Sequence, residues 1–242
     1  MSEFRLRWHE YPNADELIEA VVKAIAAEAA RAISAAGRFL IVLSGGSTPR
    51  SIYSQIVELD TPWSKWHIYF GDERCLSVGH PQRNDIMARE VWLDCVPIPA
   101  GQVHSIPAEL GPDAGATTYA RELAGVGAFD LTLLGLGDDG HTASLFPGDP
   151  TGGQPGASDV LAVHAAPKPP ASRVTLSAAR LARSYSVHLI VVGKEKRDAL
   201  SRLRNGANLP IRSVKPTNGI DLFLDSSAAP APARQCQAGR HD

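Results

Sequence analysis

A histidine and two aspartates share one short loop, and together they could move a proton at neutral pH. The loop reads GLGDDGH over residues 135–141 and contains Asp138, Asp139 and His141. Histidine is the side chain whose ordinary pKa lies closest to neutrality, and a neighbouring carboxylate can fix its tautomer. His141 is therefore the first candidate for an acid–base residue, with one of the two aspartates as its partner.

The same loop matches the G-x-G-x-x-G pattern of dinucleotide-binding folds. Two features argue against that interpretation. Asp138 and Asp139 would repel a pyrophosphate, and Pro147 cuts short the helix that should follow the loop. A metal site at Asp139 and His141 is the other alternative, but neither an HExxH motif nor a second histidine at ligand spacing accompanies them. We expect a site that uses no cofactor and no metal.

A second polar segment, SGGST at residues 44–48, directly follows an apolar run. Gly45 and Gly46 would let the backbone approach a ligand closely, and Ser47 and Thr48 add hydroxyl donors at the start of a helix. A phosphate cradle and a plain strand-to-helix turn with a hydroxyl cap both fit this pattern. The segment is not a Walker A loop, and the chain has no G-x-S-x-G elbow of a serine hydrolase.

Two basic residues stand where they could meet an anion. Arg74 follows Asp72 in the segment GDER, and its planar guanidinium suits a phosphate, although a surface ion pair is the common alternative. Lys194 opens a predicted helix, where a positive charge opposes the helix dipole. That unfavourable position indicates a bound anion, with a solvated lysine as the plain alternative.

The 242-residue chain has a net charge of −2 and no long run of one sign. This balance argues against nucleic acid or a membrane as the main partner, but it allows a local positive pocket. The N-terminal residues lack the apolar core of a signal peptide, and no stretch approaches the ~18 apolar residues of a membrane span. Three widely spaced cysteines favour a reducing compartment. We expect a cytoplasmic monomer or weak homo-oligomer whose partner is a small molecule.

The elements that must position these residues alternate between strands and helices. Asn13 and Glu16 predict a capping box that opens a long amphipathic helix. The predicted strands are residues 39–43, 67–71, 130–135, 160–165, 187–192 and 220–224, and further helices are predicted at 84–94, 178–183 and 194–204. Such alternation predicts an α/β fold with a doubly wound, mostly parallel, Rossmann-like sheet flanked by helices. We expect one domain over residues 1–225 and a disordered tail over residues 226–242.

Five segments of this chain resemble those of the 6-phosphogluconolactonase family: LSGGSTP, GDER, GLGDDGHTASLFPG, APKPPASRVTL and VVGKEKRDAL. The resemblance runs from the first predicted helix to about residue 224, and DGHTASLFPG is its most specific part. It implies hydrolysis of 6-phospho-D-glucono-1,5-lactone to 6-phosphogluconate, the second step of the oxidative pentose phosphate pathway, without a metal.

The resemblance also implies roles for single residues. His141 would be the general base that takes a proton from the attacking water, and Asp72 and Asp139 would organise the site. Arg74 and Lys194 would bind the 6-phosphate, and Arg173 is a further candidate phosphate contact. The residues implied to line the substrate pocket are Gly45, Gly46, Ser47 and Thr48.

Two alternatives belong to other functional classes. A glucosamine-6-phosphate deaminase-like isomerase shares the DGH loop and an aspartate at position 72, but it needs another carboxylate soon after the histidine. Here TASLFPG follows His141, and the next acidic residue is Asp149. A sugar-phosphate sensor of related fold would join a DNA-binding helix-turn-helix, for which about a dozen residues before the first helix leave no room. Both arguments favour the lactonase.

Overall fold

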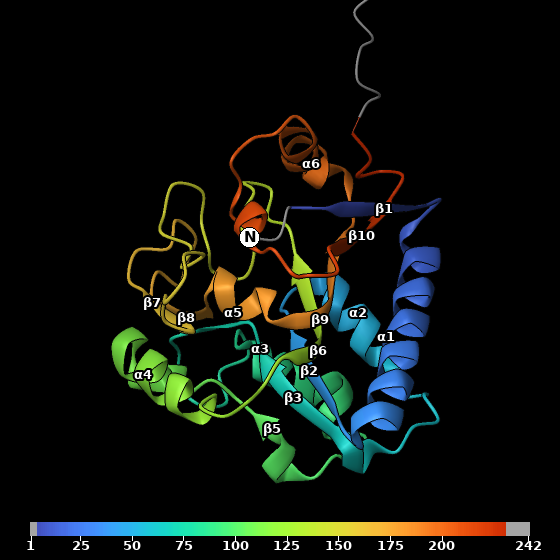
Figure 1. The fold of residues 1–242 in the computed structure, drawn as a ribbon, viewed down its shortest axis with the longest axis vertical. Coiled ribbons are helices and arrows are strands. Elements are labelled where there is room, and N and C mark those ends of the chain that lie inside the picture. Colours follow the sequence, from blue (N-terminus) through green and yellow to red (C-terminus); the bar gives the residue numbers. More distant parts are fainter. Residues whose placement is uncertain (1–3, 231–242) are drawn as a thin grey trace, which may run out of the picture.

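The computed structural model describes residues 4–230 and has a seven-stranded sheet at its centre (Figure 1). The strand order is β1-β10-β9-β6-β2-β3-β5, and every neighbouring pair is parallel. The strands are β1 (Leu6–Tyr11), β2 (Phe39–Leu43), β3 (Trp66–Phe70), β5 (Val103–His104), β6 (Phe129–Gly135), β9 (Ser184–Val191) and β10 (Ile220–Asp225). All five residues of β2 are buried, as a strand covered on both faces requires.

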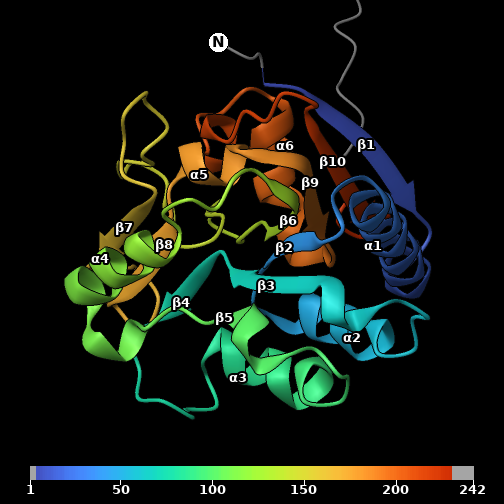
Figure 2. The ribbon, with the colours of Figure 1, turned by 60° about the horizontal axis from the view of Figure 1, so that its bottom comes forward.

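Helices cover both faces of this sheet, which confirms the predicted doubly wound α/β architecture (Figure 2). On one side lie α1 (Ala14–Ala36), α2 (Ser47–Ile56) and α3 (Asn84–Ala88), the last continued by a π-helical turn over Arg89–Leu93. On the other lie α5 (Ala178–Ala182) and α6 (Arg197–Arg204), while α4 (Pro112–Glu122) packs mainly on residues 160–163 and 173–176. The predicted cap is present, since the side chain of Asn13 accepts a hydrogen bond from the backbone N–H of Glu16.

The direction of winding reverses between β2 and β6, which are neighbours in the sheet. From β2 the chain adds β3 and β5 on one side, and from β6 it adds β9 and β10 on the other. In such sheets the loops that leave the carboxyl ends of the two central strands diverge to opposite faces and open a crevice between them. The segments that follow β2 and β6 are SGGST and GLGDDGH, so this crevice is where their residues should meet.

A second, three-stranded antiparallel sheet was not predicted from the sequence. Its order is β4-β8-β7, with β4 at Asp72–Arg74, β8 at Arg173–Leu176 and β7 at Val160–Val163. Gly71 alone separates β3 of the large sheet from β4 of the small one, and its backbone bonds to both sides. Its N–H donates to the Leu43 carbonyl at 2.9 Å, and its carbonyl accepts from the Leu176 N–H at 2.8 Å.

The structure adds a strand near the start of the expected domain and changes where the expected tail begins. The residues before the first helix form β1, which pairs with β10 and was not predicted. The expected tail does not begin at residue 226, because the Ser226 hydroxyl donates to the Pro12 carbonyl and Ala228 is fully buried. Residues 226–230 therefore pack on the domain, and the remainder of the predicted tail, residues 231–242, lies outside the described residues.

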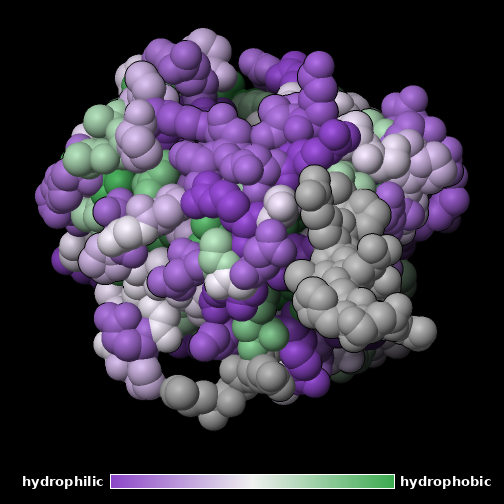
Figure 3. Space-filling model, turned by 90° about the horizontal axis from the view of Figure 1, so that it is seen from above, coloured by the Kyte–Doolittle hydropathy of each residue, from purple (hydrophilic) through white to green (hydrophobic). Residues whose placement is uncertain are grey.

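Few of the large hydrophobic side chains within residues 4–230 are exposed. On the face seen in Figure 3, hydrophilic side chains predominate and hydrophobic ones are scattered. Among the described residues, the large hydrophobic side chains that are exposed are Val78, Leu110 and Tyr185, which come from separate parts of the chain. Within residues 4–230, none of the helices has the length and apolar character needed to cross a membrane.

Candidate active site

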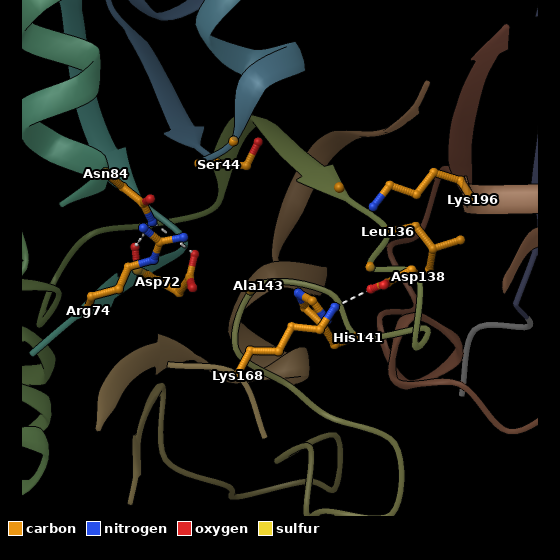
Figure 4. A pocket seen from close by; sticks show the side chains of 14 residues that line it. Ser44, Asp72, Arg74, Asn84, Leu136, Asp138, His141, Ala143, Lys168 and Lys196 are labelled. Carbon is orange, nitrogen blue, oxygen red and sulfur yellow. Dashed lines mark hydrogen bonds and ion pairs between the residues drawn. The ribbon is translucent and has the colours of Figure 1, made fainter. Parts of the chain in front are cut away.

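A cavity of about 230 Å³ opens at the crevice between β2 and β6 (Figure 4). Four parts of the fold line it: the start of the SGGST segment, β4 with the first residue of α3, the loop after β6, and two lysines. In Figure 4, Asp72, Arg74 and Asn84 gather on one side of the cavity, and Asp138, His141 and Lys168 lie on another. Residues far apart in the sequence are thus brought together as the winding of the sheet predicts.

His141 is held by its own loop. The Gly137 N–H donates to the His141 carbonyl at 2.8 Å, which closes the loop and turns the ring back toward Asp139. Ring atom Nδ1 lies 2.5 Å from Asp139 Oδ1, and the backbone N–H of His141 donates to the same oxygen at 3.1 Å. A Cβ on residue 137 would lie 2.1 Å from Nδ1, so only glycine fits there. The sequence left two aspartates as partners, and in the structure Asp139 is the one that contacts the ring.

The contact with Asp139 determines what the ring can do. An ionised carboxylate only accepts hydrogen bonds, so Nδ1 carries the proton and Nε2 keeps its lone pair. Burial raises the pKa of the Asp139 carboxyl, but hydrogen bonds from the backbone and ring of His141 lower it more, and the net pKa lies below the ordinary value. The ring is about one-fifth exposed. Nε2 is therefore the acceptor atom of the neutral ring, on a side chain that lines the cavity.

Asp72 stands on the opposite side and has different neighbours. It is 6% exposed, and the Ser144 hydroxyl donates to its Oδ2 at 2.6 Å. The Asn84 amide donates to its Oδ1 at 3.3 Å and to its backbone carbonyl at 2.9 Å. A Cβ at Gly45 would lie 2.0 Å from Asn84 Oδ1, so this glycine is required for close packing rather than for a turn. Neutral donors thus hold Asp72 in place.

Beneath this side lies Glu73, which sequence reasoning did not select. Its side chain is fully buried and accepts backbone N–H bonds from Arg74, Asn84 and Asp85 at 2.8, 2.8 and 2.9 Å. Burial raises the pKa of this carboxyl to about 8, against the opposing effect of these three donors. Because Arg74 and Asn84 both reach the cavity, Glu73 fixes the backbone from which two lining side chains project.

Three cations line the cavity, and the sequence identified only one of them. Arg74 is present as predicted, and its guanidinium donates to the Gln82 carbonyl. Lys168 and Lys196 are the other two, whereas Lys194 is exposed and does not line the cavity. Gly193 has a φ of 102° and is followed by a 3₁₀ turn, so α6 begins at Arg197 rather than at residue 194. The dipole argument made for Lys194 therefore applies to Lys196, which precedes the first residue of α6.

The remaining predicted residues lie at the margin of the cavity. Gly46 lines it, while Ser47 lines an adjoining cavity of about 330 Å³, and Thr48 lines neither of the two. Arg173 is 5% exposed and donates to the carbonyls of Lys168 and Pro170, so it braces the segment that carries Lys168. The structure thus assembles most of the predicted residues, but it places Arg173 behind the cavity wall. Within residues 4–230, no group of three or more acidic, histidine or cysteine side chains could hold a metal ion.

Comparisons with known proteins identify the family of this chain. Residues 12–223 match the family profile described as glucosamine-6-phosphate isomerases/6-phosphogluconolactonase. The 6-phosphogluconolactonase of Synechocystis is 38% identical over 229 residues, which cover 89% of this chain and 94% of that protein. The crystal structure of 6-phosphogluconolactonase from Thermotoga maritima superposes with a TM-score of 0.84 at 28% identity, and the match covers 91% of this chain and 100% of that one.

A more distant structure shares only the fold. A monomeric glucosamine-6-phosphate deaminase superposes with a TM-score of 0.74 at 19% identity, covering 92% of this chain and 98% of that one. The lactonases and the deaminase therefore share the architecture, while the sequence similarity is greater to the lactonases. The chain belongs to the glucosamine-6-phosphate isomerase/6-phosphogluconolactonase family.

Proposed function

We propose that this cavity hydrolyses 6-phospho-D-glucono-1,5-lactone to 6-phospho-D-gluconate, the second step of the oxidative pentose phosphate pathway, with His141 as the general base. One observation carries the mechanism: the bond between Nδ1 and Asp139 commits the free lone pair of the ring to Nε2, at the cavity. The similarity to proteins named 6-phosphogluconolactonase, 33–38% identical over most of their length, supports the choice of substrate.

The reaction needs one proton to be taken and one to be returned. A water molecule attacks the lactone carbonyl carbon while Nε2 of His141 takes a proton from that water. The tetrahedral intermediate collapses, the bond between the carbonyl carbon and the ring oxygen breaks, and the ring oxygen receives a proton to become a hydroxyl. The acid that forms loses its proton to water. A δ-lactone is an activated ester, so a positioned water and one base suffice.

The negative charge of the intermediate needs donors that are in place beforehand. The first N–H groups of an α-helix have no partner within the helix, and α2 begins at Ser47 directly after Gly45 and Gly46. These backbone donors are our candidates for stabilising the oxyanion, in the manner of other acyl-transfer sites. Asp72, held rigidly by Ser144 and Asn84, would orient the attacking water or a sugar hydroxyl.

Binding of the 6-phosphate would hold the lactone in register with His141. Arg74 and Lys196 are the two lining cations whose side chains make no ion pair within residues 4–230, so their charges are available to a dianion. The phosphate takes no part in bond breaking. Its binding energy would therefore act by fixing the position of the carbonyl against the base. Lys196 replaces Lys194 in this role because of where α6 begins.

An isomerase that moves a proton between two carbons is the competing reaction of this family. It would require a further carboxylate at the cavity to carry the second proton. Two acidic residues of the described chain line the cavity, and neither is that further carboxylate: Asp72 is common to the two reactions, and Asp138 is paired with Lys168. Asp139 is committed to His141. The deaminase of known structure is 19% identical, and a likeness at that level supports a shared fold alone. The lactonase reaction uses the groups that are present.

The direct test is lactone opening by purified protein in the presence of a metal chelator. The unaltered protein should open freshly made 6-phosphogluconolactone well above the spontaneous rate, and His141→Ala should lose about 10²- to 10⁴-fold of that excess, the usual contribution of a general base. His164→Ala is a matched control, because His164 also contacts an aspartate but is 61% exposed and lies outside the cavity. Full activity in His141→Ala would contradict the assignment of the base.

A further inference from the structure

The cavity contains a carboxylate that the proposed reaction does not use. Asp138 lines it beside His141, although the ligand is expected to be an anion. Lys168 extends across the opening and forms an ion pair with Asp138 Oδ1 (Figure 4). Its Nζ is also 3.9 Å from Oδ2 of Asp139, the residue that holds the ring of His141. A negative charge at this place would weaken anion binding unless the neighbouring lysine offset it.

The three cationic side chains that line the cavity differ in their hydrogen-bond and ion-pair partners. Lys196 makes no ion pair with any described residue, and Arg74 donates to the neutral carbonyl of Gln82. Lys168 alone has a carboxylate of the same chain as its partner within the cavity. The hydrogen bond from Lys168 lowers the pKa of the Asp138 carboxyl, so this carboxyl remains ionised at neutral pH. Lys168 is therefore the cation for which a bound anion must compete with Asp138.

The position of Lys168 indicates which anion it would meet. Its backbone is fixed, because the buried Arg173 guanidinium donates to the carbonyls of Lys168 and Pro170. Its ammonium group lies at the end of the cavity where Asp139 and His141 stand, and the side chain is 45% exposed. Exposed ion pairs contribute little to stability, so the lysine can exchange partners at small cost. The anion formed at this end of the cavity is the carboxylate at C1 of the opened sugar.

We propose that Asp138 is a resident counter-ion of Lys168 that weakens retention of the product carboxylate beside His141. This inference rests on the proposed function, because hydrolysis is the step that turns a neutral carbonyl into a carboxylate at this position. The lactone has no charge there and does not compete for Lys168. The product carboxylate does compete for Lys168. Asp138 already pairs with that lysine, and its negative charge also repels the product carboxylate. Asp138 is thus a residue that discriminates between substrate and product.

The experiment compares three ligands on Asp138→Asn. Binding of 6-phosphogluconate and of inorganic phosphate is measured by calorimetry, and KM is measured for 6-phosphogluconolactone. We expect product binding to tighten by about twofold to tenfold, as for removal of one nearby like charge, with phosphate affinity and lactone KM changed less than the product affinity. Asp113→Asn is the matched control, since it makes the same charge change at a side chain that is 78% exposed and outside the cavity.

A second variant tests whether Asp138 acts through Lys168. Lys168→Met should weaken product binding, and the Asp138→Asn substitution should then have a much smaller effect in the Lys168→Met background than alone. If Asp138→Asn bound lactone, phosphate and product more tightly by the same factor, the 6-phosphate would lie at Lys168. That result would overturn the proposal that Lys168 meets the product carboxylate. No change in product affinity would overturn the role of Asp138. Failure of the proposed function would appear separately, as a lack of lactone opening by the unaltered protein.

Discussion

The two sides of the cavity each present an aspartate, and the two are held in different ways. Asp139 is about one-third exposed and bonds to an ionisable ring 2.5 Å away. Asp72 is almost completely buried and bonds to the hydroxyl of Ser144 and the amide of Asn84, neither of which titrates. The first carboxylate shares a charge-dependent bond with the base. The second is fixed in space by neutral donors.

The difference separates two tasks that one pair of residues could not perform together. A carboxylate that sets the tautomer of a base must respond when the ring gains a proton, and in the proposed mechanism this is the task of Asp139. A carboxylate that positions a water or a sugar hydroxyl must keep its place throughout the reaction. The buried contacts of Asp72, supported from below by Glu73 and its three backbone donors, provide that rigidity.

The largest effect should come from removing the charge on the His141 side. Asp139→Asn keeps the size of the side chain but can present an amide donor to Nδ1, which favours the tautomer with its proton on Nε2. We expect kcat to fall by about 10²- to 10⁴-fold with a much smaller change in KM, as in other sites where a carboxylate orients a histidine. Steady-state kinetics on the lactone measure this. A loss carried mainly by KM would mean that Asp139 binds substrate.

A smaller loss should follow the same change on the opposite side. In Asp72→Asn the amide can still pair with Ser144 and Asn84, so the geometry is kept and only the charged acceptor is lost. We expect kcat/KM to fall by about tenfold to a hundredfold, the value of one hydrogen bond to a charged group. Ser144→Ala is the companion variant, because it leaves the charge and removes the tether. If Asp72→Asn lost more activity than Asp139→Asn, the assignment of the two roles would be reversed.

The smallest effect concerns stability in acid. The pKa of Asp139 is lowered in the folded protein, so its ionised form stabilises the fold above the unfolded pKa, and this contribution is lost as the pH falls through the folded pKa. The melting temperature of the unaltered protein should exceed that of Asp139→Asn by up to ~2 °C at pH 7, since the pair is partly exposed. Thermal scans from pH 7 to pH 3 should show this difference shrinking, and a difference that widened in acid would contradict the direction of the shift.

The sequence predicted five of the seven strands of the central sheet, because strands covered on both faces are short, continuous apolar runs. The edge strands β1 and β5 were not predicted. The sequence missed β1, whose residues LRWHEY mix charged and apolar types at the edge of the sheet. It also missed β4, because the three residues Asp72–Arg74 carry no apolar signal and their partner β8 lies about 100 residues away. Strands of that kind are defined by long-range pairing rather than by local composition.

The same limit applies to the site. His141 was found because its residue type and loop are distinctive, but two aspartates lay within reach and only the closed loop, with Gly137 bonded to His141, selects Asp139. Lys196 was missed because nothing in the letters GKEK shows that a 3₁₀ turn delays the helix. Lys168 was missed because its proline-rich segment does not follow a strand of the large sheet. The sequence indicated which single residues could do chemistry. It did not predict how the connecting segments arrange those residues around the cavity.

The single glycine between β3 and β4 has a further consequence. Because Gly71 passes the chain from the large sheet to the small one, Asp72 and Arg74 belong to one sheet and His141 to a loop of the other. Within residues 4–230, the hydrogen bond from Ser144 to Asp72 joins the two sides directly at the cavity. A ligand that touches both sides would cross-link the two sheets. Part of its binding energy would then add to the free energy of unfolding of the protein.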